Sequence, residues 1–550
     1  MKQTSFKRFG LMIDMSRDAV MTVDAVKKTA DLMAKMGYNT LMLYTEDTYE
    51  IEGEPYFGYL RGRYSEKELS EIVAYCETLG IEVIPCIQTL AHLDAIMRWP
   101  EYAKICDFRN ILLVEDERTY TLIDRMLKQV KKVFKTKKIH IGMDEAHMLG
   151  LGKYLDRHGY HNRFDLLTAH LKKVVEMVKA CGLEPIMWSD MFFRLGNHGV
   201  YSLDDPQIPE DLPQKIHPDV ALTYWEYFSA DPKRYDAMFR AHQKLGREIW
   251  FAGGAWTWTG FAPHNRFSVH ATKAALESCR KYGVENVILT LWGDDGGECS
   301  RFSVLPALYA SAEFARGNFD MPSIRQGFEA EFGIPYEAFC DLDLWANEAK
   351  GDAAEAITNP DKYLLYADPF LGMTDSTLRG GEGEKYKDCA EKLSPYVAHE
   401  TYGPLFRSLR DLSLVLEKKA ELGLKLRRTY QAGDKAELKK LAADLRIAKS
   451  RTEDFLRSLR AVWTAENKPH AFAVQELRLG GLIARLESCA NRVKDFTEGK
   501  IDSIPELEEK ILDYKGHFED LQKKPIRTRR YQNVASPDIL FIPGNPAASE

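Results

Sequence analysis

The sequence lacks paired cysteines. Its nine cysteines are scattered along 550 residues, and no two of them form a C-x-x-C pair. An odd and dispersed set of thiols is not typical of a disulfide framework or of a zinc site, but it is typical of reduced cysteines in the cytosol. We therefore expect a cytoplasmic protein whose fold depends on neither disulfide bonds nor zinc.

A strong charge of one sign and long apolar runs are also missing. The chain has 82 acidic and 75 basic residues and a formal net charge of −7. That balance gives no electrostatic reason to expect a nucleic acid or an anionic membrane as a partner. Asp14 interrupts the short apolar run near the N-terminus, and no stretch approaches the length of a membrane span. Neither a signal peptide nor a transmembrane helix is predicted.

What the sequence does have is a regular alternation of short apolar runs and longer amphipathic stretches, which gives way to long charged stretches in its second half. Near-continuous apolar strands separated by helices predict a parallel sheet covered by helices. Eight such units suit a closed (β/α)8 barrel, and the alternative is a doubly wound open sheet. The eight runs are residues 9–15, 40–45, 82–88, 138–144, 184–190, 221–227, 248–256 and 287–294.

The ends of these runs favour the barrel. Nearly every run ends in polar or aromatic side chains, and barrel enzymes build their sites at this face from many strands. An open sheet would concentrate such residues at a single switch point. The pairs of residues are Asp14 and Arg17, Glu46 and Asp47, Gln88 and His92, Asp144 and Glu145, Trp188 and Asp190, Trp225 and Glu226, Trp256 and Trp258, and Trp292 and Asp294.

The sequence pattern changes after the last of these runs, where long charged stretches with helical periodicity begin. One apolar stripe of a long helix consists of Leu438, Leu441, Leu445, Ala448, Phe455, Leu459 and Val462. A homodimer formed through such stripes is an open alternative. Segments 366–370 and 463–468 either pack on the barrel and close its site, or form a turn and a helix end. We predict a barrel over residues 1–318, an α-helical domain over 319–530, and a tail of loop or disorder over 531–550.

The sharpest motif is Lys138-Ile-His-Ile-Gly-Met-Asp-Glu145, an apolar run that ends in two adjacent carboxylates. Neighbouring side chains on a regular strand point to opposite faces, so both acids can face one pocket only if the backbone turns irregular, where Gly142 helps. Two close carboxylates repel each other as anions, so one pKa rises and that group can act as a general acid. The alternative is that Asp144 and Glu145 simply open the next helix.

Five of the nine tryptophans lie at the ends of the predicted strands. A pyranose ring has apolar faces of C–H bonds, and indole is a flat platform that suits them. For any one tryptophan core packing is the better explanation, but five at one end of a barrel predict a sugar-sized aromatic box. They are Trp188, Trp225, Trp256, Trp258 and Trp292.

Three polar residues complete the predicted site. Arg17 offers a fixed fork of donors to two neighbouring sugar hydroxyls, unless it forms a surface salt bridge with Asp14 or Asp18. Asp294 is predicted to accept a hydrogen bond from a sugar hydroxyl. His92 is either a buried structural residue or a direct contact. Because it has no partners at ligand spacing, we predict neither a metal nor an organic cofactor.

These motifs resemble those of glycoside hydrolase family 20, the β-N-acetylhexosaminidases. The resemblance covers about residues 9–300. Five motifs occur in the order of the family, namely Phe9-Gly-Leu-Met-Ile-Asp-Met-Ser-Arg17, Gly37-Tyr-Asn-Thr-Leu41, Pro85-Cys-Ile-Gln-Thr-Leu-Ala-His92, His140-Ile-Gly-Met-Asp-Glu145 and Trp292-Gly-Asp294. The sequence departs from the family at four positions. Met143 and Ala91 stand where the family usually has glycine, Gln88 stands where it has an acid, and Asp294 stands where glutamate is common.

The resemblance implies an exo-acting, retaining hydrolase that removes terminal β-linked N-acetylhexosamine from an oligosaccharide or glycoconjugate. The substrate's own 2-acetamido oxygen would attack the anomeric carbon and form an oxazolinium intermediate. Asp144 would orient and charge-stabilise the acetamido group, and Glu145 would act first as general acid and then as general base. The tryptophans would press the acetamido group into position, and Tyr227 or Tyr224 would hydrogen-bond its oxygen.

Two other functions stay open. A barrel β-glucosidase or β-galactosidase would use Glu145 as the acid and a distant carboxylate such as Glu226 as the nucleophile, and it would cleave sugars that lack the acetamido group. A non-catalytic sugar-binding protein would bind without turnover. The sequence does not choose between N-acetylglucosamine and N-acetylgalactosamine, because a single hydrogen bond decides that preference. It does not choose between Asp294 and Asp295 either.

Overall fold

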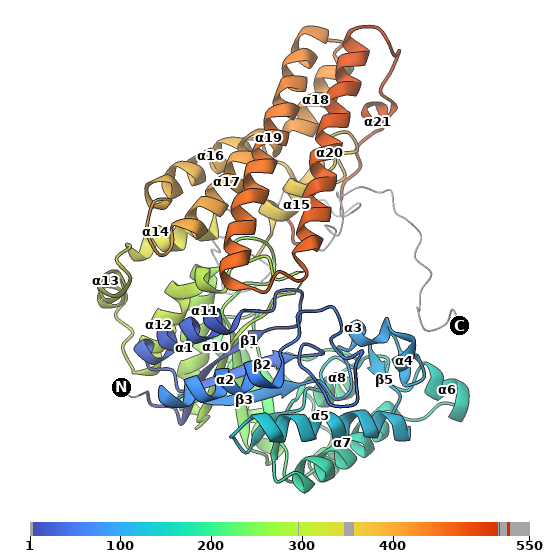
Figure 1. Ribbon diagram of the computed structural model, residues 1–550, viewed down its shortest axis with the longest axis vertical. Helices are drawn as coiled ribbons and strands as arrows, with labels where there is room; N and C mark the ends of the chain where they lie inside the picture. The colour runs from blue at the N-terminus through green and yellow to red at the C-terminus, as the bar shows by residue number, and fades with distance from the viewer. Residues whose placement is uncertain (1–3, 295, 346–356, 515, 517–524, 529–550) are drawn as a thin grey trace.

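The computed structural model describes residues 4–294, 296–345, 357–514, 516 and 525–528 of the chain. Within them, eight parallel strands close into a barrel, and a helical region follows it (Figure 1). The predicted (β/α)8 fold is confirmed, and the doubly wound open sheet is excluded. In spatial order the barrel strands are β1 (Arg8–Asp14), β2 (Thr40–Thr45), β3 (Glu82–Ile87), β6 (Lys138–His140), β7 (Glu184–Trp188), β8 (Ala221–Trp225), β9 (Ile249–Gly254) and β10 (Asn286–Leu291).

The first strand closes the barrel by pairing on both sides. Leu11 of β1 lies opposite Leu41 of β2 and opposite Leu289 of β10, and all three side chains are buried. Strands that are buried on both faces have near-continuous apolar sequences, which explains why the strand pattern was readable from the sequence. Because the carboxyl ends of all eight strands meet at one face, the polar residues that follow the strands are brought together there.

Most of the long helices around the barrel are amphipathic and bury one face against the strands, whereas the last of them is buried nearly all round. Ser65 and Glu68 form a capping box at the start of α2, and Gly37 ends α1 with a φ of 88°. These signals place the helix ends where the chain must turn back to the next strand. The long helices are α1 (Val23–Met36), α2 (Glu66–Thr78), α5 (Glu117–Val133), α7 (Arg163–Ala180), α10 (Pro232–Lys244), α11 (Asn265–Lys281) and α12 (Leu305–Ala315).

Short elements interrupt the loops between the strands and these helices. The antiparallel hairpin of β4 (Cys106–Phe108) and β5 (Ile111–Leu112) follows β3 and was not predicted. The predicted strand over 138–144 also ends earlier, because β6 stops at His140. The short helices are α3 (Asp94–Met97), α4 (Pro100–Ala103), α6 (Lys153–His158), α8 (Asp190–Gly196) and α9 (Leu212–Lys215).

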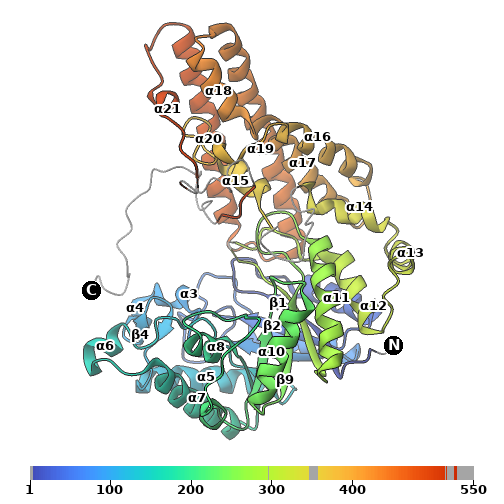
Figure 2. The same cartoon turned by 180° about the vertical axis from the view of Figure 1, so that it is seen from behind.

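The helical region is stacked on one end of the barrel, and α18 lies farthest from it (Figures 1 and 2). Helix α19 packs against both α17 and α20, and its apolar stripe from Leu438 to Val462 is buried. That stripe is therefore not available for the homodimer contact, and the homodimer stays a prediction without this support. The helices are α13 (Met321–Phe332), α14 (Tyr336–Cys340), α15 (Pro360–Tyr366), α16 (Glu382–Leu393), α17 (Gly403–Lys419), α18 (Leu422–Gln431), α19 (Lys435–Glu466), α20 (Phe472–Thr497) and α21 (Pro505–Glu508).

The end of α19 packs on the barrel. Asn467 forms a β-bridge with Met21, and the backbone N–H of Lys468 donates to the Val20 carbonyl at 2.8 Å. Segment 366–370 packs mainly inside the helical region, where Asp368 is paired with Arg485 at 2.7 Å, and the ring of Tyr366 also lies 6.4 Å from that of Phe261 on the barrel loop after β9. The predicted tail over 531–550 and the rival residue Asp295 lie outside the described residues. Among the helices that the structure describes, none is both long and apolar enough to cross a membrane.

Candidate active site

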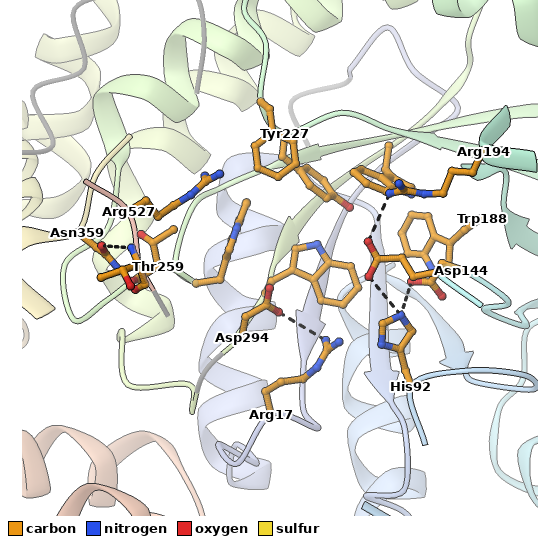
Figure 3. A pocket seen from close by; sticks show the side chains of 16 residues that line it. Arg17, His92, Asp144, Trp188, Arg194, Tyr227, Thr259, Asp294, Asn359 and Arg527 are labelled. Atoms are coloured by element: carbon orange, nitrogen blue, oxygen red, sulfur yellow. Dashed lines mark hydrogen bonds and ion pairs between the residues drawn. The ribbon is translucent and has the colours of Figure 1, made fainter. Parts of the chain in front are cut away.

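A cavity of about 450 Å³ lies where the barrel strands end (Figure 3). Its size is in the range of pockets that hold a small molecule. The predicted site residues that line it are Arg17, His92, Asp144, Glu145, Trp188, Trp225, Tyr227, Trp258, Trp292 and Asp294. The lining residues that the sequence did not single out are Arg194, Phe228, Thr259, Asn359, Arg527 and Thr528.

The two adjacent acids reach this cavity because the chain leaves β6 irregularly. Positive φ angles follow the strand at Gly142, Met143 and Glu145. A Cβ atom on Gly142 would lie 2.0 Å from Oε1 of Gln88, so the close approach requires glycine. The side chain of Glu145 is 42% exposed, whereas that of Asp144 is only 12% exposed. The alternative that the two acids open a helix is excluded, because α6 begins only at Lys153.

His92 lies between the two acids. Its Nε2 atom is 3.1 Å from Oδ2 of Asp144 and 3.8 Å from Oε2 of Glu145 (Figure 3). Burial alone would lower the pKa of His92, but the Asp144 carboxylate raises it to about 9. Burial would likewise raise the pKa of Asp144, but the His92 cation and its hydrogen bonds hold it below its usual value. Asp144 is therefore not the acid whose pKa is raised, because a cation lies between the two acids.

A line of polar contacts runs from Asp144 to Arg17. Asp144 Oδ1 accepts a hydrogen bond from Gln88 Nε2 at 2.8 Å, and the same amide donates to the hydroxyl of Tyr44 at 3.0 Å. Tyr44 donates to Glu46 Oε1 at 3.0 Å, and that oxygen lies 3.2 Å from Arg17 Nε. Burial raises the pKa of Glu46 to about 7. Gln88, which stands where the resemblance has an acid, thus supplies the N–H donor that an anionic Asp144 requires.

Arg17 is held by carboxylates while it lines the cavity. Its Nη1 atom is 3.0 Å from Oδ2 of Asp14 and 3.9 Å from Oδ1 of Asp294. Asp18 pairs with Arg61 instead, at 3.2 Å. The salt-bridge alternative thus holds for Asp14, but it does not remove Arg17 from the cavity. Such pairing fixes the orientation of the guanidinium fork in the cavity wall.

Aromatic rings form much of the cavity wall. The rings of Trp188 and Trp292 lie 6.1 Å apart. Trp225 and Tyr227 are stacked with ring centroids 5.2 Å apart, and Trp258 meets Tyr227 edge-on at 5.5 Å. Flat aromatic faces of this kind pack well against the C–H faces of a pyranose. The wall is therefore suited to a sugar ring.

Burial separates Tyr227 from Tyr224, a choice that the sequence left open, and it corrects the predicted role of Trp256. Tyr227 lines the cavity, and burial raises its pKa so that the phenol remains a hydrogen-bond donor. Tyr224 is fully buried and does not line the cavity. Trp256 is also fully buried: its ring stacks on Trp258 at 4.2 Å, and its Nε1 donates to the Tyr227 carbonyl at 3.1 Å. We therefore correct its predicted role from substrate contact to support of the wall.

Part of the wall comes from beyond the barrel. Asn359 donates through Nδ2 to the carbonyls of Thr259 and Thr528, at 2.9 and 3.0 Å, and its Oδ1 accepts from the N–H of Thr528 at 3.0 Å. We call residues 525–528 the C-terminal strap. The Arg527 guanidinium of this strap lies 5.5 Å from the ring of Phe228. No apolar run precedes Asn359 or the C-terminal strap, so the pattern that predicted the strands could not predict their place in the cavity wall.

Two adjacent acids in an aromatic cavity at the C-terminal face of a barrel are typical of barrel glycoside hydrolases. A sequence model of the glycosyl hydrolase family 20 catalytic domain matches residues 6–231, and a model of the glycoside hydrolase 20C C-terminal domain matches residues 337–525. Together the two matches span more than half of the chain. The chain therefore belongs to glycoside hydrolase family 20.

Individual relatives match only part of the chain. Hexosaminidase D of Homo sapiens is 26% identical over 190 residues, which cover 33% of this chain and 39% of that protein. Hexosaminidase D of Bos taurus is 24% identical over 262 residues, covering 45% of this chain and 69% of that protein. Among solved structures, beta-N-acetylhexosaminidase from Bacteroides fragilis NCTC 9343 is 19% identical with a TM-score of 0.45, covering 60% of this chain and 71% of that chain.

Proposed function

We propose that this chain is a β-N-acetylhexosaminidase that removes terminal β-linked N-acetylhexosamine with retention of configuration, by substrate-assisted catalysis. The matched relatives are hexosaminidases, and the catalytic-domain match includes both acids. One observation carries the mechanism: Asp144 is held as an anion by His92 and Gln88, beside the more exposed Glu145 in an aromatic cavity.

An anionic Asp144 suits a substrate that supplies its own nucleophile. When the acetamido oxygen attacks the anomeric carbon, the amide nitrogen gains positive charge and its N–H becomes a stronger donor. A fixed carboxylate can accept that hydrogen bond and stabilise the oxazolinium, because it is already oriented and desolvated. The protonated phenol of Tyr227 can donate to the acetamido oxygen, and Trp188 and Trp292 can hold the group in the attacking geometry.

Glu145 handles the proton. In the first step it gives its proton to the glycosidic oxygen as the bond from that oxygen to the anomeric carbon breaks and the bond to the acetamido oxygen forms. In the second step the Glu145 anion takes a proton from water, which attacks the anomeric carbon and reopens the oxazolinium ring. Its greater exposure compared with Asp144 suits this exchange with the leaving group and with water.

The arrangement of Glu226 argues against a direct carboxylate nucleophile at that position. Its side chain is buried and accepts hydrogen bonds from the Ser202 hydroxyl and from the N–H of Phe228. Glu226 does not line the cavity. A nucleophile has to reach the anomeric carbon, so this residue would need a large rearrangement before it could attack.

We further propose a cytoplasmic location. All nine cysteines are free thiols, and eight of them are buried in the fold. Free, mostly buried thiols are expected in a reducing compartment. Fractionation of the source cells, followed by detection of the chain in the soluble or the particulate fraction, would test this location.

The proposed function is tested by measuring hydrolysis of phenyl β-N-acetylglucosaminide, β-N-acetylgalactosaminide and β-glucoside. The wild type should cleave only the acetamido sugars, and their relative rates would rank the two epimers. Glu145→Gln and Asp144→Asn should each lower kcat/KM by about 10²- to 10⁴-fold, because each removes a group that acts on the reacting atoms. The first product detected by NMR should be the β-anomer.

Glu226→Gln is the matched control, since it neutralises a buried carboxylate that does not line the cavity. It should retain turnover of the acetamido sugars. Equal cleavage of the glucoside, abolished by Glu226→Gln, would favour a carboxylate nucleophile and contradict the proposal. Sugar binding without cleavage of any substrate would favour the non-catalytic alternative.

A further inference from the structure

Glu145 is contacted from a side that the proposed reaction does not use. Asp190, the first residue of α8, accepts a hydrogen bond through Oδ2 from the backbone N–H of Glu145 at 3.2 Å. The same oxygen accepts from Nε of Arg194 at 3.1 Å. Nη2 of Arg194 lies 3.5 Å from Oε1 of Glu145 (Figure 3). One buried carboxylate thus fixes the Glu145 backbone and places a cation beside the Glu145 side chain.

The local sequence explains why Asp190 and Arg194 act together. They stand four residues apart at the start of a helix, a spacing that puts two side chains on one face. Arg194 is also restrained by its N–H donation to the Gly199 carbonyl at 3.2 Å and by the ring of Trp225, 5.8 Å from its guanidinium. Its position beside Glu145 is therefore set by several partners from one side of the cavity.

We propose that Asp190 and Arg194 are positioning residues that hold Glu145 and tune its protonation with opposite charges, an inference that rests on the proposed function. Glu145 must carry a proton in the first step and must lose it before the second. The Arg194 cation stabilises the Glu145 anion, whereas the Asp190 anion opposes it. Removing the Arg194 charge should therefore favour the protonated form of Glu145, and removing the Asp190 charge should favour its anionic form.

Other titratable groups also face this pair. Asp144 and His147 lie on the chain after β6, and His92 lies on the loop after β3. The hydroxyl of Tyr201, which follows α8, also interacts with Asp190. Burial, together with the nearby Asp144 charge, raises the pKa of Asp190 to about 7, so Asp190 is an anion on the alkaline limb of the profile, where its charge is tested. Asp190 is distinguished from these neighbours because it contacts both the Glu145 backbone and Arg194.

The test is the pH dependence of kcat/KM for Asp190→Asn and Arg194→Met, with a phenyl β-N-acetylhexosaminide as substrate. The alkaline limb of this profile reports deprotonation of the general acid in the free enzyme. Asp190→Asn removes a negative charge, so the limb should move to lower pH by about one unit. Arg194→Met removes a positive charge, so the limb should move to higher pH by about one unit.

A leaving-group comparison adds a second readout. Phenyl glycosides need protonation of the leaving oxygen, whereas 2,4-dinitrophenyl glycosides need it far less. For both variants kcat should therefore fall about 10-fold with the phenyl substrate and clearly less with the dinitrophenyl substrate. A purely structural role would lower both rates equally and would leave the limbs where they are.

Asp107→Asn is the control, because Asp107 is a buried carboxylate outside the cavity that also accepts backbone hydrogen bonds, from Gly150 at 2.7 Å and Tyr154 at 2.8 Å. It should keep the wild-type limbs. Wild-type limbs in active Asp190→Asn and Arg194→Met would overturn the inference, and if Asp190→Asn fails to fold, Arg194→Met alone decides. An inactive wild type would overturn the proposed function instead, and this inference with it.

Discussion

At the residue scale, acids alternate with cations and neutral hydrogen-bonding groups in a series that includes five cavity-lining residues and the buried residues behind them. Each acid has a cation or an N–H donor as its neighbour, so that removing any one member takes a polar contact away from the next residues in the series. This is why a substitution away from the reacting atoms is expected to change the pH dependence. From one end to the other, the series is Arg17, Glu46, Tyr44, Gln88, Asp144, His92, Glu145, Arg194 and Asp190.

The first prediction at this scale concerns His92→Gln. Without the His92 cation, burial dominates the Asp144 environment and its pKa should rise. Because catalysis needs the Asp144 anion, the acid limb of the kcat profile should move to higher pH by about one to two units. An unchanged acid limb, measured with a phenyl β-N-acetylhexosaminide, would mean that Asp144 does not depend on His92 for its charge.

The same substitution should change stability with a defined pH dependence. The pKa of His92 rises from 6.5 to about 9 on folding, so its contribution is fully present below the unfolded value and is lost as the pH rises through the folded value. The difference in Tm between wild type and His92→Gln should therefore be largest near pH 6 and should fade above about pH 9. Thermal unfolding in a series of buffers measures it.

His170→Gln is the control for that series. His170 is buried, and burial lowers its pKa to about 4, so it is neutral over the same range. Its effect on Tm should be constant from about pH 7.5 to 9 and should become smaller, not larger, as the pH falls towards 6, because only the unfolded chain takes up a proton at that position there. Parallel curves for His92→Gln and His170→Gln would contradict the assigned charge of His92.

Residues that follow within a few positions of an apolar run could be predicted from the sequence, and those placed by a helix or by a distant segment could not. Arg17 and Asp144 follow apolar runs, so the barrel rule located them. Arg194 enters the cavity only because α8 turns it back beside Glu145. Trp256 and Trp258 stand two residues apart on an irregular loop, where no periodicity distinguishes the cavity residue from its support.

At the element scale, the apolar pattern continues beyond the end of β6, so it predicted too long a strand there. All eight barrel strands were predicted, but the apolar residues after His140 continue the pattern without continuing the strand. Apolar side chains report burial, and burial does not require sheet pairing. The positive φ angles at Gly142 and Met143 turn the chain out of the sheet while Met143 stays buried.

The prediction at this scale concerns Gly142→Ala. Its Cβ would lie 2.0 Å from Gln88 Oε1, and the φ of +71° is itself unfavourable for alanine. Gln88 would have to move away from Asp144, so kcat should fall by about 10-fold or more, and stability by about 1–3 kcal/mol. Kinetics with a phenyl β-N-acetylhexosaminide and urea denaturation measure the two effects.

Gly182→Ala separates the clash from the backbone strain. Gly182 also has a φ of +71°, but nothing lies within 4 Å of its added Cβ. This variant should lose about 1 kcal/mol of stability and keep the wild-type kcat. If Gly142→Ala also kept the wild-type kcat, the contact between Gln88 and Asp144 would not be needed for turnover.

At the scale of the whole molecule, the barrel does not complete the cavity by itself. The helical region supplies Asn359, and the C-terminal strap supplies Arg527 and Thr528. The contact between Asn359 and Thr528 joins residues that are 169 positions apart in the chain. This contact uses backbone groups of the strap, and every residue type has such groups. The sequence could therefore predict a helical region but could not predict which of its residues line the cavity.

The last prediction concerns Asn359→Ala, which removes the three hydrogen bonds that tie the strap to the barrel loop at Thr259. Each is worth about 0.5–1.5 kcal/mol, so the strap should be held less tightly in the wall, while the backbone N–H of residue 359 still donates to the Ile526 carbonyl at 3.1 Å. Because the strap lies apart from the reacting acids, KM should rise about 10-fold while kcat changes by less than about 3-fold.

Asn286→Ala is the control, since Asn286 is equally buried at the start of β10, at the opposite end of the barrel, and bonds Glu248 at 3.0 Å. That variant should lose stability without a change in KM. An unchanged KM for Asn359→Ala would mean that the strap only covers the cavity, whereas equal losses in kcat and kcat/KM would mean that it acts on the transition state.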